Sequence, residues 1–507
     1  MFFSRKFTLA SVLLALFLLT SGTAFGASMS KGGEVPLTIL DALNVALKHN
    51  EDIQESYGRV SAAEAGAMSA QGVYDATVFG NGRYGRWDSL QPDMWDFASD
   101  STKTYGRLDV GIRQRIPTGA TATVYFTHSD ERRLSYPGKK TRQYKDYVTF
   151  ELTQSLLRGI GDKEQRGAIE SALLSVQDSE ESRSLIISQV MLDLIRAYWN
   201  VEYCDNNIQV AKKSLSMAQE VLRRENVRFK QGLSQGVDVD RARVAVKQRQ
   251  YSILQYERDL ALAREQLMLL LNHPDFTSRT NIKTVSAPMS QVIELPDPEE
   301  SMRAAVNNRH ELKQMDILLK QLDIELDINT NKLLPTLDLS AGVTTSNGND
   351  FVRSAENFKD TDEDWSWYVG VSVSFPLQNR EARGAVKRTE QLLRIAKERV
   401  HKTIRVVETD VRDALHALYL AREGLPVVKS AYNSAVQTMN GEMKRFEMLQ
   451  ANNRDLLASQ DSVAREEMSY YRALIDYNVA LAAYHHSCGT LLDKYAVVIG
   501  PHKAMLR

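Results

Sequence analysis

Apolar side chains recur at steps of four and three residues over two very long stretches of the chain. In the second stretch this spacing is followed by Val400, Ile404, Val407, Val411, Leu415 and Leu418. Such spacing is typical of the seam between paired helices. At about 1.5 Å per residue, the predicted helices 162–230 and 379–447 would each span roughly 100 Å. Helices of that length need neighbours, so the pattern predicts coiled-coil packing.

The two long stretches are copies of one pattern. The shift along the chain that places Arg228-Phe229 on Arg445-Phe446 also places Asp238 on Asp455, and we call it the repeat shift. In each copy the long helix is followed by a turn and a returning helix, 237–272 or 453–489. A repeat of this length is strong evidence of architecture. The sequence therefore predicts two helical hairpins, 162–272 and 379–489.

A shorter helix is expected to precede each hairpin. Thr38 and Asp41 have capping-box spacing, and Asp297 followed by Pro298 is typical of a helix start. We expect these helices to run without interruption to about Gln71 and about Lys332. The offset from Thr38 to Asp297 is larger than the repeat shift. The first copy must therefore contain extra residues, which lie between Asp75 and Gly161.

The extra residues and their surroundings alternate between apolar and polar positions, which predicts strands. The six candidate strands are 77–87, 108–112, 122–126, 148–152, 336–345 and 369–375. A Pro117-Thr118-Gly119 turn would close one hairpin. The polar linkers 88–104, 129–145 and 346–364 are expected to be exposed loops.

Two architectures explain this alternation. One is an antiparallel sheet with one face in water, and the other is a transmembrane barrel with lipid outside and water inside. Six strands cannot close even the smallest barrel, which needs about eight, so a barrel would require several chains.

The N-terminal residues have the pattern of a signal peptide, 1–26. Arg5 and Lys6 precede an apolar run from Leu9 to Thr20, and cleavage is expected before Ala27. The alternative, an uncleaved membrane anchor, is disfavoured because the run is short. No later apolar run is long enough to predict a transmembrane helix. The mature chain is expected to leave the cytoplasm.

Charge and cysteine content narrow the possible functions. With 63 basic and 64 acidic side chains the net charge is −1, which gives no general attraction to nucleic acid. Only Cys204 and Cys488 are present, so we expect two packed free thiols rather than a disulfide framework. Gly159-Ile160-Gly161 lacks the third glycine of a dinucleotide-binding loop. His485 and His486 are adjacent, so they point to different helix faces and make a poor pair of metal ligands. We expect no enzyme activity, cofactor or metal.

Several ordered motifs resemble those of the TolC-like outer-membrane factor (outer membrane efflux protein) family. They are Leu37-Thr38-Ile39-Leu40-Asp41-Ala42-Leu43, Tyr74-Asp75-Ala76-Thr77-Val78, Leu333-Leu334-Pro335-Thr336-Leu337, Thr153-Gln154-Ser155-Leu156-Leu157-Arg158-Gly159 and the two turns. The resemblance covers nearly all of the chain after the signal peptide. It implies a mostly α fold with a transmembrane β-barrel portion and long coiled-coil hairpins in two structural repeats. Three chains would form one α/β-barrel tunnel.

The resemblance also implies domains and a function. The repeats would span 27–290 and 291–491, followed by a C-terminal tail, 492–507. The protein would be a passive outer-membrane channel of a tripartite efflux or type I secretion system, with its helices in the periplasm. Its implied partners are a periplasmic adaptor (membrane fusion) protein, an inner-membrane pump of RND or ABC type, and outer-membrane lipid. The alternative is a periplasmic coiled-coil scaffold without a pore.

In this family the hairpin turns form the periplasmic tips, where the tunnel narrows and the adaptor docks. The resemblance assigns this role to Phe229, Gly232, Asp238, Phe446, Arg454 and Asp455. A threefold ring of Asp455 would favour cations, with Arg454 as a compensating partner. Alternatively, Asp238 is only a helix cap and the aromatics are only coiled-coil knobs. The chain departs from the family pattern at Leu449, Ala458, Ser155 and the extra residues of the first copy.

Overall fold

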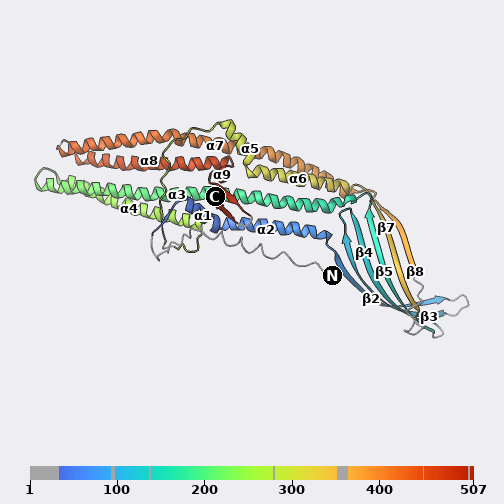
Figure 1. The fold of residues 1–507 in the computed structure, drawn as a ribbon. Helices are drawn as coiled ribbons and strands as arrows, with labels where there is room; N and C mark the ends of the chain where they lie inside the picture. The colour runs from blue at the N-terminus through green and yellow to red at the C-terminus, as the bar shows by residue number, and fades with distance from the viewer. Residues whose placement is uncertain are drawn as a thin grey trace, which may run out of the picture.

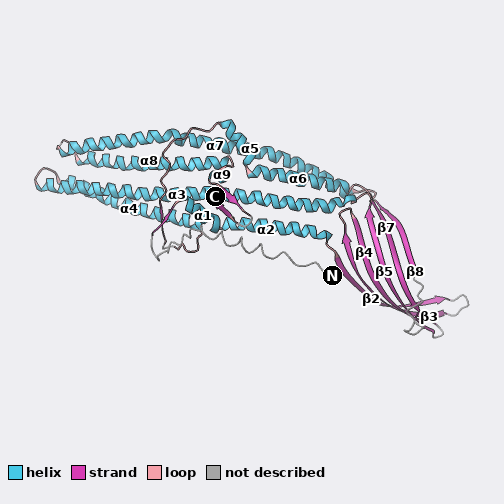
Figure 2. Ribbon diagram, in the orientation of Figure 1, coloured by secondary structure: helices cyan, strands magenta, loops and turns pink. Residues whose placement is uncertain are grey.

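The computed structural model describes residues 34–92, 98–135, 139–277, 280–350, 364–448, 450–500 and 503–506. The predicted signal peptide lies outside these residues. Long helices run side by side along most of the molecule, and one sheet occupies a single end (Figures 1 and 2). None of the described helices is long and apolar enough to cross a membrane.

The two predicted hairpins are confirmed. The first consists of α3 (Lys163–Lys230) and α4 (Gly236–Leu271), and the second of α7 (Arg380–Glu447) and α8 (Asn453–Ser487). Both long helices have 68 residues, and α7 continues through Pro426. Near the hairpin turns the helices lie in the order α4, α3, α8, α7, so α4 and α7 are at the edges of the layer (Figure 1).

The helices before the hairpins are interrupted, contrary to our expectation. The first divides into α1 (Ile39–His49) and α2 (Glu51–Gln71), and the second into α5 (Pro298–Asn308) and α6 (His310–Asn331). Asn50 and Arg309 break the helices by adopting extended backbone conformations. Asn50 also caps α2, because its Oδ1 accepts a hydrogen bond from the Ile53 amide at 3.2 Å. The caps predicted at Thr38 and Asp297 are confirmed.

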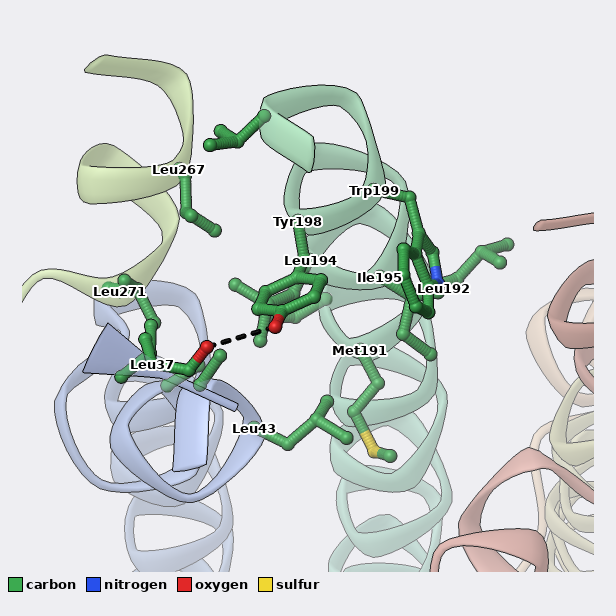
Figure 3. Close-up of a cluster of buried hydrophobic side chains, with 14 of the residues drawn as sticks. Leu37, Leu43, Met191, Leu192, Leu194, Ile195, Tyr198, Trp199, Leu267 and Leu271 are labelled. Atoms are coloured by element: carbon green, nitrogen blue, oxygen red, sulfur yellow. Dashed lines mark hydrogen bonds between the residues drawn. The ribbon is translucent and has the colours of Figure 1, made fainter. Parts of the chain in front are cut away.

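The main hydrophobic core surrounds the middle of α3 (Figure 3). Tyr198 is fully buried there, and its hydroxyl donates to the Leu37 carbonyl at 2.9 Å. Leu37 ends β1 (Glu34–Leu37), which pairs in parallel with β6 (Asn281–Thr284). The sequence did not predict this pair, the short helix α9 (Leu491–Lys494), or the hairpin of β9 (Val497–Ile499) and β10 (Ala504–Leu506). These small elements pack beside α3 and α8 at mid-length.

The six predicted strands form one antiparallel sheet in the order β2-β3-β4-β5-β7-β8. Its strands are β2 (Thr77–Pro92), β3 (Ala98–Arg115), β4 (Ala120–Ser135), β5 (Lys139–Ser155), β7 (Thr336–Asp350) and β8 (Asp364–Ser374). The first copy supplies four strands and the second two, which accounts for the extra residues of the first copy. Short 3₁₀ turns, Gly72–Tyr74 and Ile160–Asp162, lie where the sheet meets the helices.

The prediction that the polar linkers are loops was wrong for every part of them that the structure describes. Residues 88–92, 98–104, 129–135, 139–145, 346–350 and 364 belong to the strands. Their polar side chains pair across the sheet, as in Lys103–Glu131 at 2.9 Å and Arg142–Asp130 at 2.8 Å. Backbone pairing and these ion pairs stabilise strands that lack an apolar face.

The two faces of the sheet differ in chemistry. The register places Val124 opposite Phe150 and Phe150 opposite Val343, and all three side chains are exposed. The opposite face carries polar side chains such as Thr149, whose hydroxyl lies 3.1 Å from that of Thr344. Within the described residues, β2 and β8 each have a neighbouring strand on one side only. The isolated chain therefore exposes an apolar face and two open sheet edges.

Candidate functional site: the tips of the two hairpins

The two hairpin turns are closed in the same way. Gly232 follows α3 with a φ of 73°, a left-handed conformation that favours glycine. The Leu233 amide donates to the Arg228 carbonyl at 2.9 Å, which is the long bond of a Schellman motif. In the second hairpin the Gln450 amide donates to the Arg445 carbonyl at 2.8 Å. These residues are also related by the repeat shift, so the repeat holds at the tips. Leu449 lies outside the described residues.

The two turn aromatics have different environments, although the resemblance gives them one role. Phe446 is only 3% exposed and packs with Val221, Val246 and Leu456 between the hairpins. The Arg228 guanidinium carbon lies 4.6 Å from the centre of the Phe446 ring, a cation–π arrangement. Phe229 is 51% exposed. One aromatic therefore joins the hairpins of a chain, whereas the other has no comparable cover.

A network of charges also links the hairpins. Arg224 donates to Glu447 at 3.0 Å and to Glu220 at 2.9 Å. Hydrogen bonds from Arg223 and Arg224 lower the pKa of Glu220 to about 2. Glu220 is therefore ionised at neutral pH and holds Arg224 beside the second hairpin.

Asp238 takes part in a second link, mainly through its backbone. Its carboxylate pairs with Arg241 at 2.9 Å, while its carbonyl accepts a 2.7 Å hydrogen bond from the Asn453 side chain. Arg241 also donates to Asn453 at 3.3 Å. The residue that caps α4 is Gln235 rather than Asp238. Sequence reasoning missed Asn453, since it lies in a polar run with no distinguishing spacing.

Arg454 and Asp455 lie at the start of α8 and face solvent in the isolated chain. Their side chains are 77% and 48% exposed, and the Arg454 Nε lies 3.6 Å from Asp455 Oδ1. The structure thus brings Arg454 to Asp455 and Asp238 to Arg241, but it gives no direct contact between the two aspartates. Both aspartates remain at the ends of returning helices.

Arg249 is a further inter-hairpin residue that the sequence did not reveal. It is buried and donates from α4 to Asp461 at 2.7 Å and to Gln460 at 3.1 Å, both on α8. It also donates to the Ser214 carbonyl of α3 at 3.1 Å. A long helix rich in arginine offers no sequence signal that distinguishes this one.

The cysteine and histidine side chains of the described residues do not gather into a metal-binding group. The described residues contain no group of three or more histidine, cysteine or carboxylate side chains able to hold a metal ion. Cys204 and Cys488 are both buried and free, as predicted. His486 contacts Ser188 whereas His485 contacts Thr490, so the two rings have separate partners.

A family model described as outer membrane efflux protein matches residues 126–273 and 302–489. This chain belongs to the outer membrane efflux protein family. It is accordingly an outer-membrane efflux channel, a transport protein rather than an enzyme. The two matched segments contain the two hairpins, so the family assignment rests on both repeats.

Solved structures share the fold at low sequence identity. The outer-membrane channel OprN aligns with a TM-score of 0.65 and 14% identity over 89% of this chain and 90% of its own. The Campylobacter jejuni CmeC outer membrane channel aligns with a TM-score of 0.66 and 12% identity, over 89% of this chain and 86% of its own. CusC, which forms a transmembrane channel, aligns with a TM-score of 0.66 and 13% identity, over 91% of this chain and 95% of its own. No curated protein sequence matches the chain. The predicted fold class is confirmed.

Proposed function

We propose that three copies of this chain close one channel through the outer membrane, with the hairpins extending as a tunnel into the periplasm. The observation that carries the proposal is the open six-stranded sheet with its exposed apolar face. An open sheet edge is not tolerated in lipid, because its backbone groups would lack hydrogen-bond partners. Six alternating strands leave β2 and β8 running in opposite directions. The β8 edge of one copy can therefore pair antiparallel with the β2 edge of the next.

The widths of the two parts of the chain support a continuous tube. Four helices side by side, at about 9 Å between axes, cover roughly 36 Å of circumference. Six strands spaced about 4.8 Å apart and tilted by about 40° cover roughly 38 Å. Each copy would then occupy the same arc in the barrel and in the tunnel. The polar face of the sheet, with pairs such as Tyr368–Glu151 at 3.0 Å, would line the water-filled lumen.

The hairpin tips, at the far end from the sheet, are the proposed constriction and docking surface (Figure 1). Phe229, Gly232, Asp238, Phe446, Arg454 and Asp455 all lie at this end. The partner we propose there is a periplasmic adaptor, which would join the channel to an inner-membrane pump of RND or ABC type. Substrates would pass through passively, with the pump as the part of the assembly that supplies energy.

A direct test uses the intact mature chain. Expressed in a Gram-negative host, it should require detergent for extraction, migrate as a heat-sensitive trimer and form channels in planar bilayers. A monomer in the soluble periplasmic fraction, with no channels, would instead support the scaffold alternative.

We predict that Asp455→Ala changes single-channel conductance or its block by divalent cations. Three exposed carboxylates brought together at a constriction attract cations, and their removal weakens that attraction. The control is Asp476→Ala on the same helix, which removes an exposed carboxylate paired with Arg472 far from the tip. Traces that match the wild type for both variants would remove Asp455 from the constriction.

A further inference from the structure

The sheet meets the helical part of the molecule at a single junction (Figure 1), and there its apolar face ends in an arginine. Beyond β5, the Leu156 amide donates to the Leu337 carbonyl at 2.7 Å. The Arg158 amide then donates to the Pro335 carbonyl at 3.3 Å. These bonds continue the pairing of β5 with β7, so Leu156 and Arg158 follow Phe150 on the apolar face. Arg158 is therefore the last side chain of that face before α3.

The position of Arg158 matches the boundary of a membrane. At the other end of the apolar face on β5 lies the exposed Val148, beyond which Asp146 pairs with His128 at 2.7 Å. At about 3.3 Å per residue and a tilt of about 40°, the chain from Val148 to Arg158 rises about 25 Å, which is the height of the apolar band of an outer-membrane barrel. This inference rests on the channel proposed above. In that channel Arg158 lies at the level of the lipid head groups on the periplasmic side.

A cavity of about 540 Å³ lies at this level, between the end of α6 and the start of α7. Its lining includes three basic side chains, Arg158, Lys332 and Arg380, and one carboxylate, Glu381. The charge of the lining is therefore net positive. Leu377, whose side chain is 93% exposed, also lines the cavity. The cavity thus combines positive charge with apolar surface at the boundary between lipid and water.

Two of the three basic side chains are not neutralised within the chain. Lys332 pairs with Glu164 at 3.0 Å. Among the residues that the structure describes, no carboxylate pairs with the side chain of Arg158 or Arg380. Both guanidinium groups keep their donors available to a ligand in the cavity.

The neighbouring copy would not neutralise Arg380 either. The repeat shift places Arg380 at the position of Lys163, which pairs with Asp327 of α6 at 3.0 Å. In the proposed ring, α7 lies against α2 of the next copy. The offset between the capping residues of the two preceding helices places Met68 of α2 at the position of Asp327. A methionine supplies no charge, so Arg380 remains unpaired in the trimer.

The first copy fills the equivalent place with an anion of its own. Asp162, directly before α3, is fully buried and pairs with Arg115 of β3 at 2.6 Å. The repeat shift places the neutral Asn379 at the position of Asp162, and Asn379 lines the cavity. The second copy thus lacks this carboxylate at the start of α7. An anion from outside the chain would take its place.

We propose that this cavity binds the phosphate of an anionic glycerophospholipid, such as phosphatidylglycerol, from the periplasmic leaflet of the membrane. Arg158 and Arg380 donate charge-assisted hydrogen bonds to the phosphate oxygens, a contact that suits the planar guanidinium group. The acyl chains extend along the apolar face past Leu156. The net positive lining favours an anionic lipid over a zwitterionic one. Each chain supplies one cavity, so a trimer binds three lipids.

Native mass spectrometry of the delipidated trimer in detergent tests this site, with phosphatidylglycerol as the probe. The wild type should retain up to three lipids per trimer. Arg158→Gln combined with Arg380→Gln should bind at least about tenfold more weakly, because hydrogen bonds from charged donors are lost. The matched control is Arg394→Gln, which removes an exposed arginine of α7 roughly 20 Å from Arg380 and should bind like the wild type.

Two further probes separate the lipid from its parts. Diacylglycerol has the acyl chains without the phosphate, and inorganic phosphate has the charge without the chains. The proposal is overturned if diacylglycerol is retained as strongly as phosphatidylglycerol, if inorganic phosphate displaces the lipid at equal concentration, or if the double variant binds like the wild type.

A measurement on the wild type alone covers the case in which the double variant does not assemble. Phosphatidylglycerol should raise the temperature at which the trimer dissociates, because a ligand stabilises the state that binds it. Diacylglycerol should not, and an equal rise with both lipids contradicts the proposal. A wild-type chain that gives no heat-sensitive trimer would refute the proposed channel, whereas a conducting trimer that retains no phosphatidylglycerol would refute the lipid site only.

Discussion

Arg249 donates more hydrogen bonds between the two hairpins than any residue that the sequence singled out. Its guanidinium is buried and donates to the Ser214 and Leu457 carbonyls as well as to Gln460 and Asp461. Since Asp461 is largely exposed, the ion pair itself contributes little. The larger effect comes from the buried Gln460 amide oxygen, which would lose its donor if Arg249 were removed. The Ser214 and Leu457 carbonyls would each lose a charged donor but keep their helical hydrogen bonds.

We predict that Arg249→Ala lowers the free energy of unfolding by about 2–3 kcal/mol, because the buried Gln460 oxygen is left unpaired and hydrogen bonds from a charged donor are lost. Thermal unfolding of the detergent-solubilised protein, followed by the circular dichroism of its helices, measures this loss. Arg258→Ala on the same helix is the control, because Arg258 pairs with the adjacent Asp259 at the surface. Equal melting temperatures for Arg249→Ala and the control would contradict the interpretation.

His486 predicts a pH dependence of stability. Burial, followed by the nearby charge of Arg309, lowers its pKa below the ordinary value of 6.5. The folded state thus favours the neutral ring, which lies 2.9 Å from the Ser188 hydroxyl. A group whose pKa is lowered on folding stabilises the protein above its unfolded pKa, and that contribution is lost as the pH falls. We expect the melting temperature to fall between pH 7.5 and 5.5, and to fall less in His486→Gln. An unchanged slope in the variant would exclude His486.

At the scale of elements, the long helices could be predicted because tens of residues repeat one spacing. The breaks at Asn50 and Arg309 could not, since a single extended residue leaves the apolar spacing on both sides intact. The outer parts of the strands were missed for a different reason: their polar side chains pair across the sheet, and that pairing depends on register. Tip residues were found through the repeat and the resemblance. The unequal burial of Phe229 and Phe446 depends on neighbouring hairpins, which a repeat in the sequence does not reveal.

The hairpin turn itself predicts a difference between two nearby glycines. Gly232 has a positive φ, so Gly232→Ala should cost about 1 kcal/mol through strain in the left-handed conformation. Gly236→Ala should be close to neutral, because its new methyl group would meet only the Phe229 ring at 3.9 Å. Thermal unfolding of the two variants side by side measures the difference. A larger loss for Gly236→Ala would contradict this account of the turn.

For the whole molecule, the largest difference in length between the repeats lies at the sheet end. The hairpins of the two copies match in length and turn geometry, whereas the first copy alone contributes β3 and β4. The turn between these strands is fixed to the helices, because Arg115 pairs with the fully buried Asp162 at 2.6 Å beside the start of α3. The extra hairpin is therefore part of the continuous sheet. With these two strands the sheet has six strands, and its width becomes close to the width of the four helices that lie side by side.

Membrane insertion tests this architecture through two residues of β8. Val369 is 61% exposed on the apolar face, while Ser366 belongs to the polar face. Val369 lies five residues from the helical end of β8, about 13 Å into an apolar band roughly 25 Å tall, near its middle. A lysine facing lipid at that depth costs about 2–4 kcal/mol in each copy. Val369→Lys should therefore sharply reduce the yield of heat-sensitive trimer in outer-membrane fractions, whereas Ser366→Lys, facing the lumen, should assemble normally and change only conductance. Normal assembly of both variants would mean that the apolar face does not contact lipid.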